Sequence, residues 1–260
     1  MTATSIKHGN FDSLAGDYAR YRPGYAASIV PAVLSLLPVP AREADAVDIG
    51  AGTGIWTRML AAQNLRSVTA VEPSDEMRRH GSLTAPELNI AWRAGAAEST
   101  GLPARAFDLV SMASSFHWTD FEKATAEFQR ILRPGGRFVA LWNPRMIELN
   151  PLLAEIESEI TRLNPNVKRV SSGRSGLTGR LTDLLWATSG FDDVVYLEAR
   201  HVAAQTPDQY LGAWRSVNDL RVQLGPDLFD EFLRFVERKT AGLAKIETTY
   251  LTRAWAARRV

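Results

Sequence analysis

The sequence predicts an α/β fold built on a doubly wound sheet. Between residues 46 and 143, short apolar runs alternate with segments of helical periodicity. Strands separated by helices at this spacing form right-handed crossovers. Most of the runs lack strict polar alternation, which is typical of strands buried on both faces of a parallel sheet. The 260 residues, 45% of them hydrophobic and 23% charged, suffice for one globular domain with a substantial core.

The elements can be assigned in chain order. Pro31, Pro38 and Pro40 interrupt the apolar stretch 26–41, so it predicts a packed helix and a loop rather than a membrane span, which needs roughly 20 unbroken apolar residues. Five strands are expected at residues 46–50, 67–72, 88–95, 107–115 and 137–143.

Two of the intervening helices have recognisable ends. Ser74 is placed to cap the helix that follows it, with acidic residues in its first turn. Thr119 and Glu122 have capping-box spacing at the start of the next helix, and Pro134-Gly135-Gly136 ends it.

Beyond residue 143 the pattern changes. An amphipathic helix at 146–163 is followed by a Gly/Ser-rich basic segment, expected to be a mobile loop, at 164–180. Two strands with partial alternation are expected near a sheet edge, at 191–205 and 246–260. Between them two helices are expected, at 207–225 and 226–243.

Composition limits the classes of partner and site. Lys and Arg number 30 against 29 Asp and Glu, so the net charge of +1 gives no general field to hold nucleic acid or an anionic membrane. The absence of cysteine excludes disulfides, thiolate zinc sites and cysteine nucleophiles. The four histidines are scattered, so no metal site is expected. The polar N-terminus lacks a signal-peptide core, and a cytoplasmic location is expected.

The segment AVDIGAGTGIWT, residues 46–57, contains the strongest ligand-binding pattern. Gly50, Gly52 and Gly54 follow a strand that carries Asp48. A dinucleotide fingerprint needs glycine at the sixth position, which is Ile55 here, and no Gly-Lys-Ser/Thr phosphate loop follows. Glu72 ends the next strand, ~20 residues after the turn, where a carboxylate can accept both hydroxyls of an adenosine ribose.

Together with this turn, three further segments resemble the class I S-adenosylmethionine (SAM)-dependent methyltransferases. They are RAGAAESTGLPARAFDLVSM (93–112), LRPGGRFV (132–139) and FDSLAGDYARYRPGY (11–25). The resemblance is to the type 11 group, which includes ubiquinone-biosynthesis-like and trans-aconitate-like enzymes. It covers residues 11–143 well and 144–260 only in layout. It implies a Rossmann-like, seven-stranded doubly wound sheet, with the last strand antiparallel and a helical lid over the active site.

The resemblance also implies that residues 1–260 form a single domain with three parts. Residues 1–45 form a helical cap, 46–143 a SAM-binding core, and 144–260 the substrate lid and the last two strands. The residues expected to bind the cofactor SAM are Tyr18, Arg22, Asp48, Gly50, Ala51, Gly52, Glu72, Pro73, Met77, Ala96, Ala97, Glu98 and Ser114.

The methyl acceptor is expected beyond the strand ends, over the glycine turn. His117, in the loop SSFHWTD (114–120), is the candidate general base, with pocket lining as the alternative. Arg22, at the expected start of a helix, could clamp a carboxylate of the methionine or of the substrate, or form a surface salt bridge. The expected substrate-binding residues are Tyr21, Phe116, Trp118, Trp142, Asn143, Trp214 and Arg215.

The predicted function is therefore methyl transfer from SAM to a small-molecule acceptor, with no nucleic-acid or membrane partner. An NAD(P)-dependent oxidoreductase and a nucleic-acid methyltransferase are the alternatives, the latter because Lys168, Arg169, Arg174 and Arg180 form a basic segment. A catalytically inactive fold used for protein contacts is a third. The sequence leaves open the acceptor, the choice among oxygen, nitrogen and carbon, and the oligomeric state.

Overall fold

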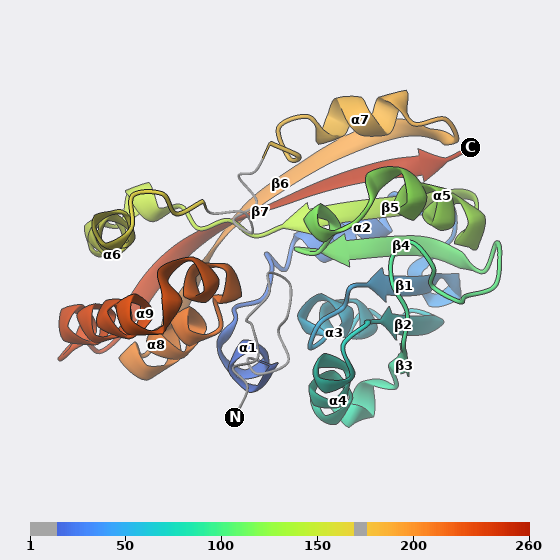
Figure 1. Ribbon diagram of the computed structural model, residues 1–260. Helices are drawn as coiled ribbons and strands as arrows, with labels where there is room; N and C mark the ends of the chain where they lie inside the picture. The colour runs from blue at the N-terminus through green and yellow to red at the C-terminus, as the bar shows by residue number, and fades with distance from the viewer. Residues whose placement is uncertain (1–14, 169–175) are drawn as a thin grey trace, which may run out of the picture.

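Seven strands form one mixed sheet in the order β3-β2-β1-β4-β5-β7-β6 (Figure 1). The computed structural model describes residues 15–168 and 176–260. Neighbouring strands among β1 to β5 pair in parallel, and β7 runs antiparallel to both β5 and β6. The strands are β1 Asp45–Ile49, β2 Ser67–Val71, β3 Ala91–Arg93, β4 Phe107–Ala113, β5 Leu132–Trp142, β6 Phe191–Gln205 and β7 Ile246–Arg259. The predicted seven-stranded Rossmann-like sheet with an antiparallel last strand is confirmed.

Alternate residues of the central strands fill two different cores. Val47 and Val110 face one cluster that includes α5 (Phe121–Ile131) and α7 (Leu181–Ala187). Ala46 and Leu109 face the other, with α2 (Ile29–Leu34) and α3 (Ile55–Ala61). Because successive strand side chains point to opposite faces, a strand covered by helices on both sides must be apolar throughout. This explains the continuous apolar runs.

The edge strand β3 departs from the prediction. Only Ala91–Arg93 pair with β2, rather than residues 88–95, and the strand is partly exposed. An edge strand has a neighbour on one side only, so it needs neither the length nor the burial of the central strands.

The helix caps are partly as predicted. The Ser74 hydroxyl accepts the Met77 N–H at the start of α4 (Asp75–Leu83). The capping box of Thr119 and Glu122 is wrong, because Asp120 caps α5 by accepting the Lys123 N–H at 3.2 Å. The Thr119 hydroxyl instead donates to the Phe116 carbonyl at 2.9 Å. Short 3-10 helices span Ala41–Glu43, Pro86–Leu88, Phe116–Trp118 and Ile147–Leu149.

Three helices form a separate layer at the far end of the long β6–β7 hairpin (Figure 1). They are α6 (Pro151–Leu163), α8 (Pro207–Arg215) and α9 (Asn218–Thr240), and they enclose an apolar cluster of their own. The predicted helix 207–225 is divided, because α8 ends at Arg215. The predicted boundary between 225 and 226 coincides with a kink in α9 at Gly225, whose φ of 72° is not helical. These lid helices and the sheet flank α1 (Ala15–Tyr21) (Figure 1).

Two predictions fall partly outside the described residues. The basic loop 164–180 includes residues 169–175, and the N-terminal cap 1–45 includes residues 1–14. Among the residues that the structure does describe, no helix combines the length and apolarity needed to cross a bilayer.

Candidate active site

The glycine turn follows β1 at the carboxyl edge of the sheet. β1 lies between β2 and β4, so the strand order reverses here, and open α/β sheets bind ligands at such a point. Gly50 and Gly52 have φ of 63° and 57°, in the left-handed region. A Cβ on Gly50 would lie 2.8 Å from the Ser115 side chain, whereas one on Gly52 would meet no atom within 4 Å. At position 50 a side chain would collide with Ser115, so packing requires glycine. At position 52 there is room for a side chain, and the left-handed backbone conformation is what favours glycine.

Asp48, in the strand that leads into this turn, is hydrogen-bonded to the neighbouring helix and strand. Its carboxylate accepts hydrogen bonds from Thr57 of α3 at 2.6 Å and Ser111 of β4 at 3.2 Å. Burial raises its pKa to about 7, although those hydroxyl donors act in the opposite direction. Asp48 is fully buried and lines neither of the cavities described below. The hydrogen bond from Thr57 links β1 to α3, and a direct contact of Asp48 with the cofactor stays a prediction.

Glu72 joins the end of β2 to the glycine turn. Its Oε2 accepts the Gly52 N–H at 2.8 Å, and its Oε1 accepts the Ser74 N–H at 3.0 Å. The side chain is nearly buried yet contributes to the wall of a cavity. Each carboxylate oxygen can accept more than one hydrogen bond, so these backbone contacts orient Glu72 without exhausting its capacity.

A cavity of about 660 Å³ opens over the turn and Glu72. Its lining includes eleven of the residues predicted to bind the cofactor: Tyr18, Gly50, Ala51, Gly52, Glu72, Pro73, Met77, Ala96, Ala97, Glu98 and Ser114. Glu98 also accepts the Asp120 N–H at 2.8 Å, which ties this wall to the start of α5. The structure therefore brings most of the predicted cofactor set into one cavity.

A second cavity, of about 270 Å³, lies between the sheet edge, α1 and the lid. Arg22 lines this cavity rather than the larger one. It follows the end of α1, so the expected position at the start of a helix is wrong, whereas its expected role in binding a carboxylate stays a prediction. The Arg22 guanidinium donates to the Ser216 hydroxyl at 2.8 Å. The two cavities share lining residues Tyr18, Tyr25, Ile55, Ser114 and Trp118.

The predicted substrate residues divide into two groups. Trp118, Asn143 and Trp214 line the smaller cavity. The others line neither cavity: Phe116 and Trp142 are buried in the sheet core, Arg215 is exposed, and Tyr21 packs on α8. Their contact with substrate stays a prediction.

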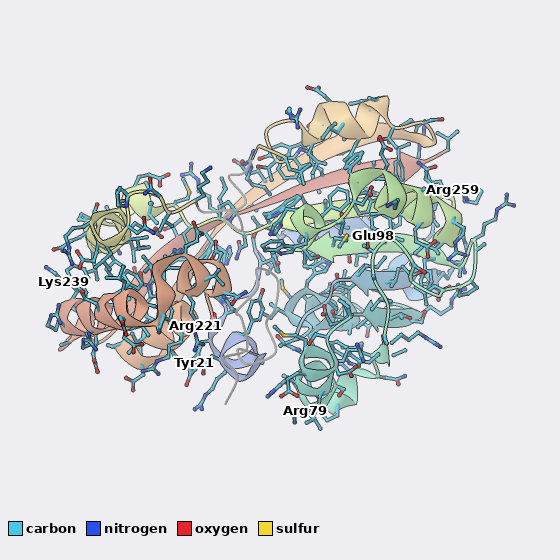
Figure 2. The ribbon with its side chains drawn as sticks, in the orientation of Figure 1. Tyr21, Arg79, Glu98, Arg221, Lys239 and Arg259 are labelled. Carbon is cyan, nitrogen blue, oxygen red and sulfur yellow. The ribbon has the colours of Figure 1, made fainter. Side chains whose placement is uncertain are left out.

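The Tyr21 contact joins α1 to the lid. A Cβ on Gly212 of α8 would lie 2.3 Å from the Tyr21 ring, so the ring occupies the space that a larger residue would need. Figure 2 shows Tyr21 on the side of α1 that faces the lid helices.

His117 is in the lining of neither cavity, and its ring lies next to that of Trp118. The indole N–H of Trp142 donates to His117 Nδ1 at 3.2 Å. Because indole nitrogen is only a donor, Nδ1 must be the acceptor nitrogen, and the neutral ring carries its proton on Nε2. Burial lowers the pKa of His117 to about 4, with a smaller opposing effect of Asp219. This geometry favours a neutral hydrogen-bond donor over a general base, so the catalytic role of His117 stays a prediction.

Several lining residues were missed by sequence reasoning. Tyr25 bonds to Ser114 through their hydroxyls at 2.9 Å, and burial raises the pKa of Tyr25. Arg145, Tyr210 and Tyr250 line the smaller cavity. Arg145 comes three residues after β5, and its place at a strand's carboxyl end was the available signal. Among residues 15–168 and 176–260, no group of three or more His, Asp or Glu side chains could hold a metal.

Comparison with known proteins agrees with this geometry. Residues 47–140 match the family model described as "Methyltransferase domain". An uncharacterized methyltransferase from Mycobacterium tuberculosis is 39% identical over 136 residues, covering 52% of this chain and 53% of the relative. The chain thus spans about half the length of that curated relative.

Solved structures extend the likeness of fold to nearly the whole chain. A candidate type II methyltransferase from Anaeromyxobacter dehalogenans has a TM-score of 0.65 at 23% identity, covering 92% of this chain and 98% of that one. A phosphoethanolamine N-methyltransferase from Haemonchus contortus has a TM-score of 0.55 at 17% identity, covering 95% and 57%. At these identities the likeness shows the fold alone. Residues 47–140 are thus similar to the methyltransferase-domain family, and the sheet as a whole has the fold of these solved methyltransferase structures.

Proposed function

We propose that this chain transfers a methyl group from SAM to a small-molecule acceptor. The observation that carries the proposal is the meeting of two cavities at the carboxyl edge of the sheet. The larger is built on the glycine turn and Glu72, and residues of the lid helices form part of the wall of the smaller. In this proposal residues 46–143 hold the donor, and residues 144–260 complete the acceptor site.

The larger cavity fits SAM in shape and in chemistry. Gly52 leaves open space beside the backbone, as a closely approaching ligand requires. Glu72, held by the Gly52 and Ser74 N–H groups, would accept the ribose hydroxyls, and no phosphate is present in SAM to repel it. The Haemonchus contortus structure was solved in complex with S-adenosylhomocysteine, which supports the same ligand class here.

The junction of the cavities would be the site of transfer. SAM, when bound, supplies an electrophilic methyl group on a positively charged sulfur. The protein then has to keep acceptor and methyl in contact and remove competing water. Tyr18, Tyr25, Ser114 and Trp118 line both cavities and would do this. The Ser114 backbone, with φ of 57°, is held in an uncommon conformation for a non-glycine residue, which is more frequent at functional sites.

Calorimetric titration with S-adenosylhomocysteine and, separately, with NADH tests the proposal. We expect S-adenosylhomocysteine to bind more tightly, because the turn has Ile55 where a dinucleotide site has its third glycine. Tighter binding of NADH, or no binding of S-adenosylhomocysteine at millimolar concentration, would refute the assignment.

A further inference from the structure

We propose that the smaller cavity selects a methyl acceptor that carries a carboxylate, held by Arg22 and Arg145. The inference rests on the proposed function and gives the acceptor a chemical class. Both arginines line the cavity, Arg22 from the end of α1 and Arg145 from the segment after β5. Both lie near Tyr250 of β7: burial raises the pKa of that hydroxyl, and the charges of Arg145 and Arg22 act in the opposite direction.

The two guanidinium groups differ in their present partners. Arg145 pairs with Glu157 of α6 at 2.5 Å and lies over the Trp214 ring at 4.3 Å, so its position is fixed. Arg22 donates to the hydroxyl and carbonyl of Ser216 at 2.8 and 3.3 Å. Within the described part of the chain, Arg22 forms no salt bridge.

The acidic groups in the lining already have partners. Glu157 is held by Arg145, and Asp219 accepts the Leu220 N–H in the first turn of α9. A carboxylate entering beside Arg22 would therefore gain charge-assisted hydrogen bonds at a cation whose protein partners are neutral.

A further polar group points to the same ligand. The Tyr210 hydroxyl is buried in the cavity wall, where it interacts with Arg145 and Trp214. A phenol hydroxyl can donate one hydrogen bond, and a carboxylate oxygen beside Arg145 would accept it. The remaining walls include Tyr18, Trp118 and Trp214, which suit a flat organic body. The volume of about 270 Å³ holds on the order of nine waters, so the acceptor is small.

Binding of matched probe pairs to the full chain, saturated with S-adenosylhomocysteine, tests this inference. The probes are benzoate and butanoate, each compared with its primary amide by calorimetry. We expect at least one carboxylate to bind tenfold or more tightly than its amide. We expect Arg22→Gln to remove that preference and to leave the affinity for S-adenosylhomocysteine within twofold. The matched control is Arg20→Gln, which changes an exposed arginine of α1, two residues before Arg22 and outside both cavities.

The variant Tyr210→Phe removes a single oxygen and keeps the test valid if Arg22→Gln fails to fold. It should weaken the carboxylate probe about threefold to tenfold and leave the amide unchanged. If wild-type protein binds amides as well as carboxylates, or if Arg22→Gln keeps the preference, the inference fails while the SAM assignment stands. If S-adenosylhomocysteine does not bind at all, the proposed function itself fails.

Discussion

The Glu72 carboxylate accepts two backbone N–H groups and faces the larger cavity. We expect Glu72→Ala to weaken SAM binding by roughly 1.5–3 kcal/mol, because charge-assisted hydrogen bonds to the ribose would be lost. Calorimetry with S-adenosylhomocysteine measures the change. Glu76→Ala, which alters a carboxylate on the outer surface of α4, is the control and should leave the affinity as it is. Unchanged affinity in Glu72→Ala would remove its ribose role.

His117 should make stability depend on pH. Its pKa is 6.5 when unperturbed and about 4 in the folded chain, because burial disfavours the charged ring. Between these values the unfolded chain binds a proton that the folded chain does not, so the free energy of unfolding rises with pH through this window. Stability is lost as pH falls from about 6.5 to 4, by an amount on the order of 3 kcal/mol.

Urea unfolding at several pH values, with wild type and His117→Gln, measures this contribution. The variant should have a shallower rise between pH 4 and 6.5. Identical slopes would mean that His117 is not buried as a neutral ring.

The contact between α1 and α8 depends on one glycine. Gly212 lies inside α8, where alanine would ordinarily be favoured by about 1 kcal/mol. Here the new methyl group would meet the Tyr21 ring, so we expect Gly212→Ala to lower the free energy of unfolding by roughly 1–3 kcal/mol. Chemical denaturation measures it. In a Tyr21→Ala background the same substitution should become neutral or stabilising. A loss that is equal in both backgrounds would show that the ring is not the obstacle.

Binding of S-adenosylhomocysteine should increase hydrogen-exchange protection in some segments of the chain and not in others. The larger cavity is lined from α1, the strand ends and α4, whereas α9 contributes to the smaller cavity through Asn218 and Asp219. We therefore expect S-adenosylhomocysteine to increase hydrogen-exchange protection at residues 50–54, 72–77 and 15–21, and to leave residues 226–240 unchanged. Exchange followed by mass spectrometry measures this. An increase in protection along all of α9 would contradict this expectation and show that S-adenosylhomocysteine by itself stabilises the lid helices.

The sequence by itself determined the parallel core and the residues that meet at the larger cavity. The glycine turn and Glu72 belong to one strand-helix-strand unit, β1-α3-β2. Within such a unit the spacing of residues along the sequence determines where they lie in the sheet. One right-handed crossover separates Gly52, which follows β1, from Glu72, which follows β2. Because β1 and β2 are parallel neighbours, the two residues lie side by side at the ends of these strands.

Only the tertiary structure decided which residues line the smaller cavity. Phe116 and Trp118 are two residues apart, yet one is buried in the sheet core and the other lines both cavities, because the chain turns between them. Arg22, Arg145, Tyr210 and Tyr250 come from four separate segments and meet only because the β6–β7 hairpin carries the lid helices over the sheet edge. Such long-range packing leaves no periodic signal in the sequence. A turn and the strand before it, in contrast, have a local sequence pattern that can be recognised.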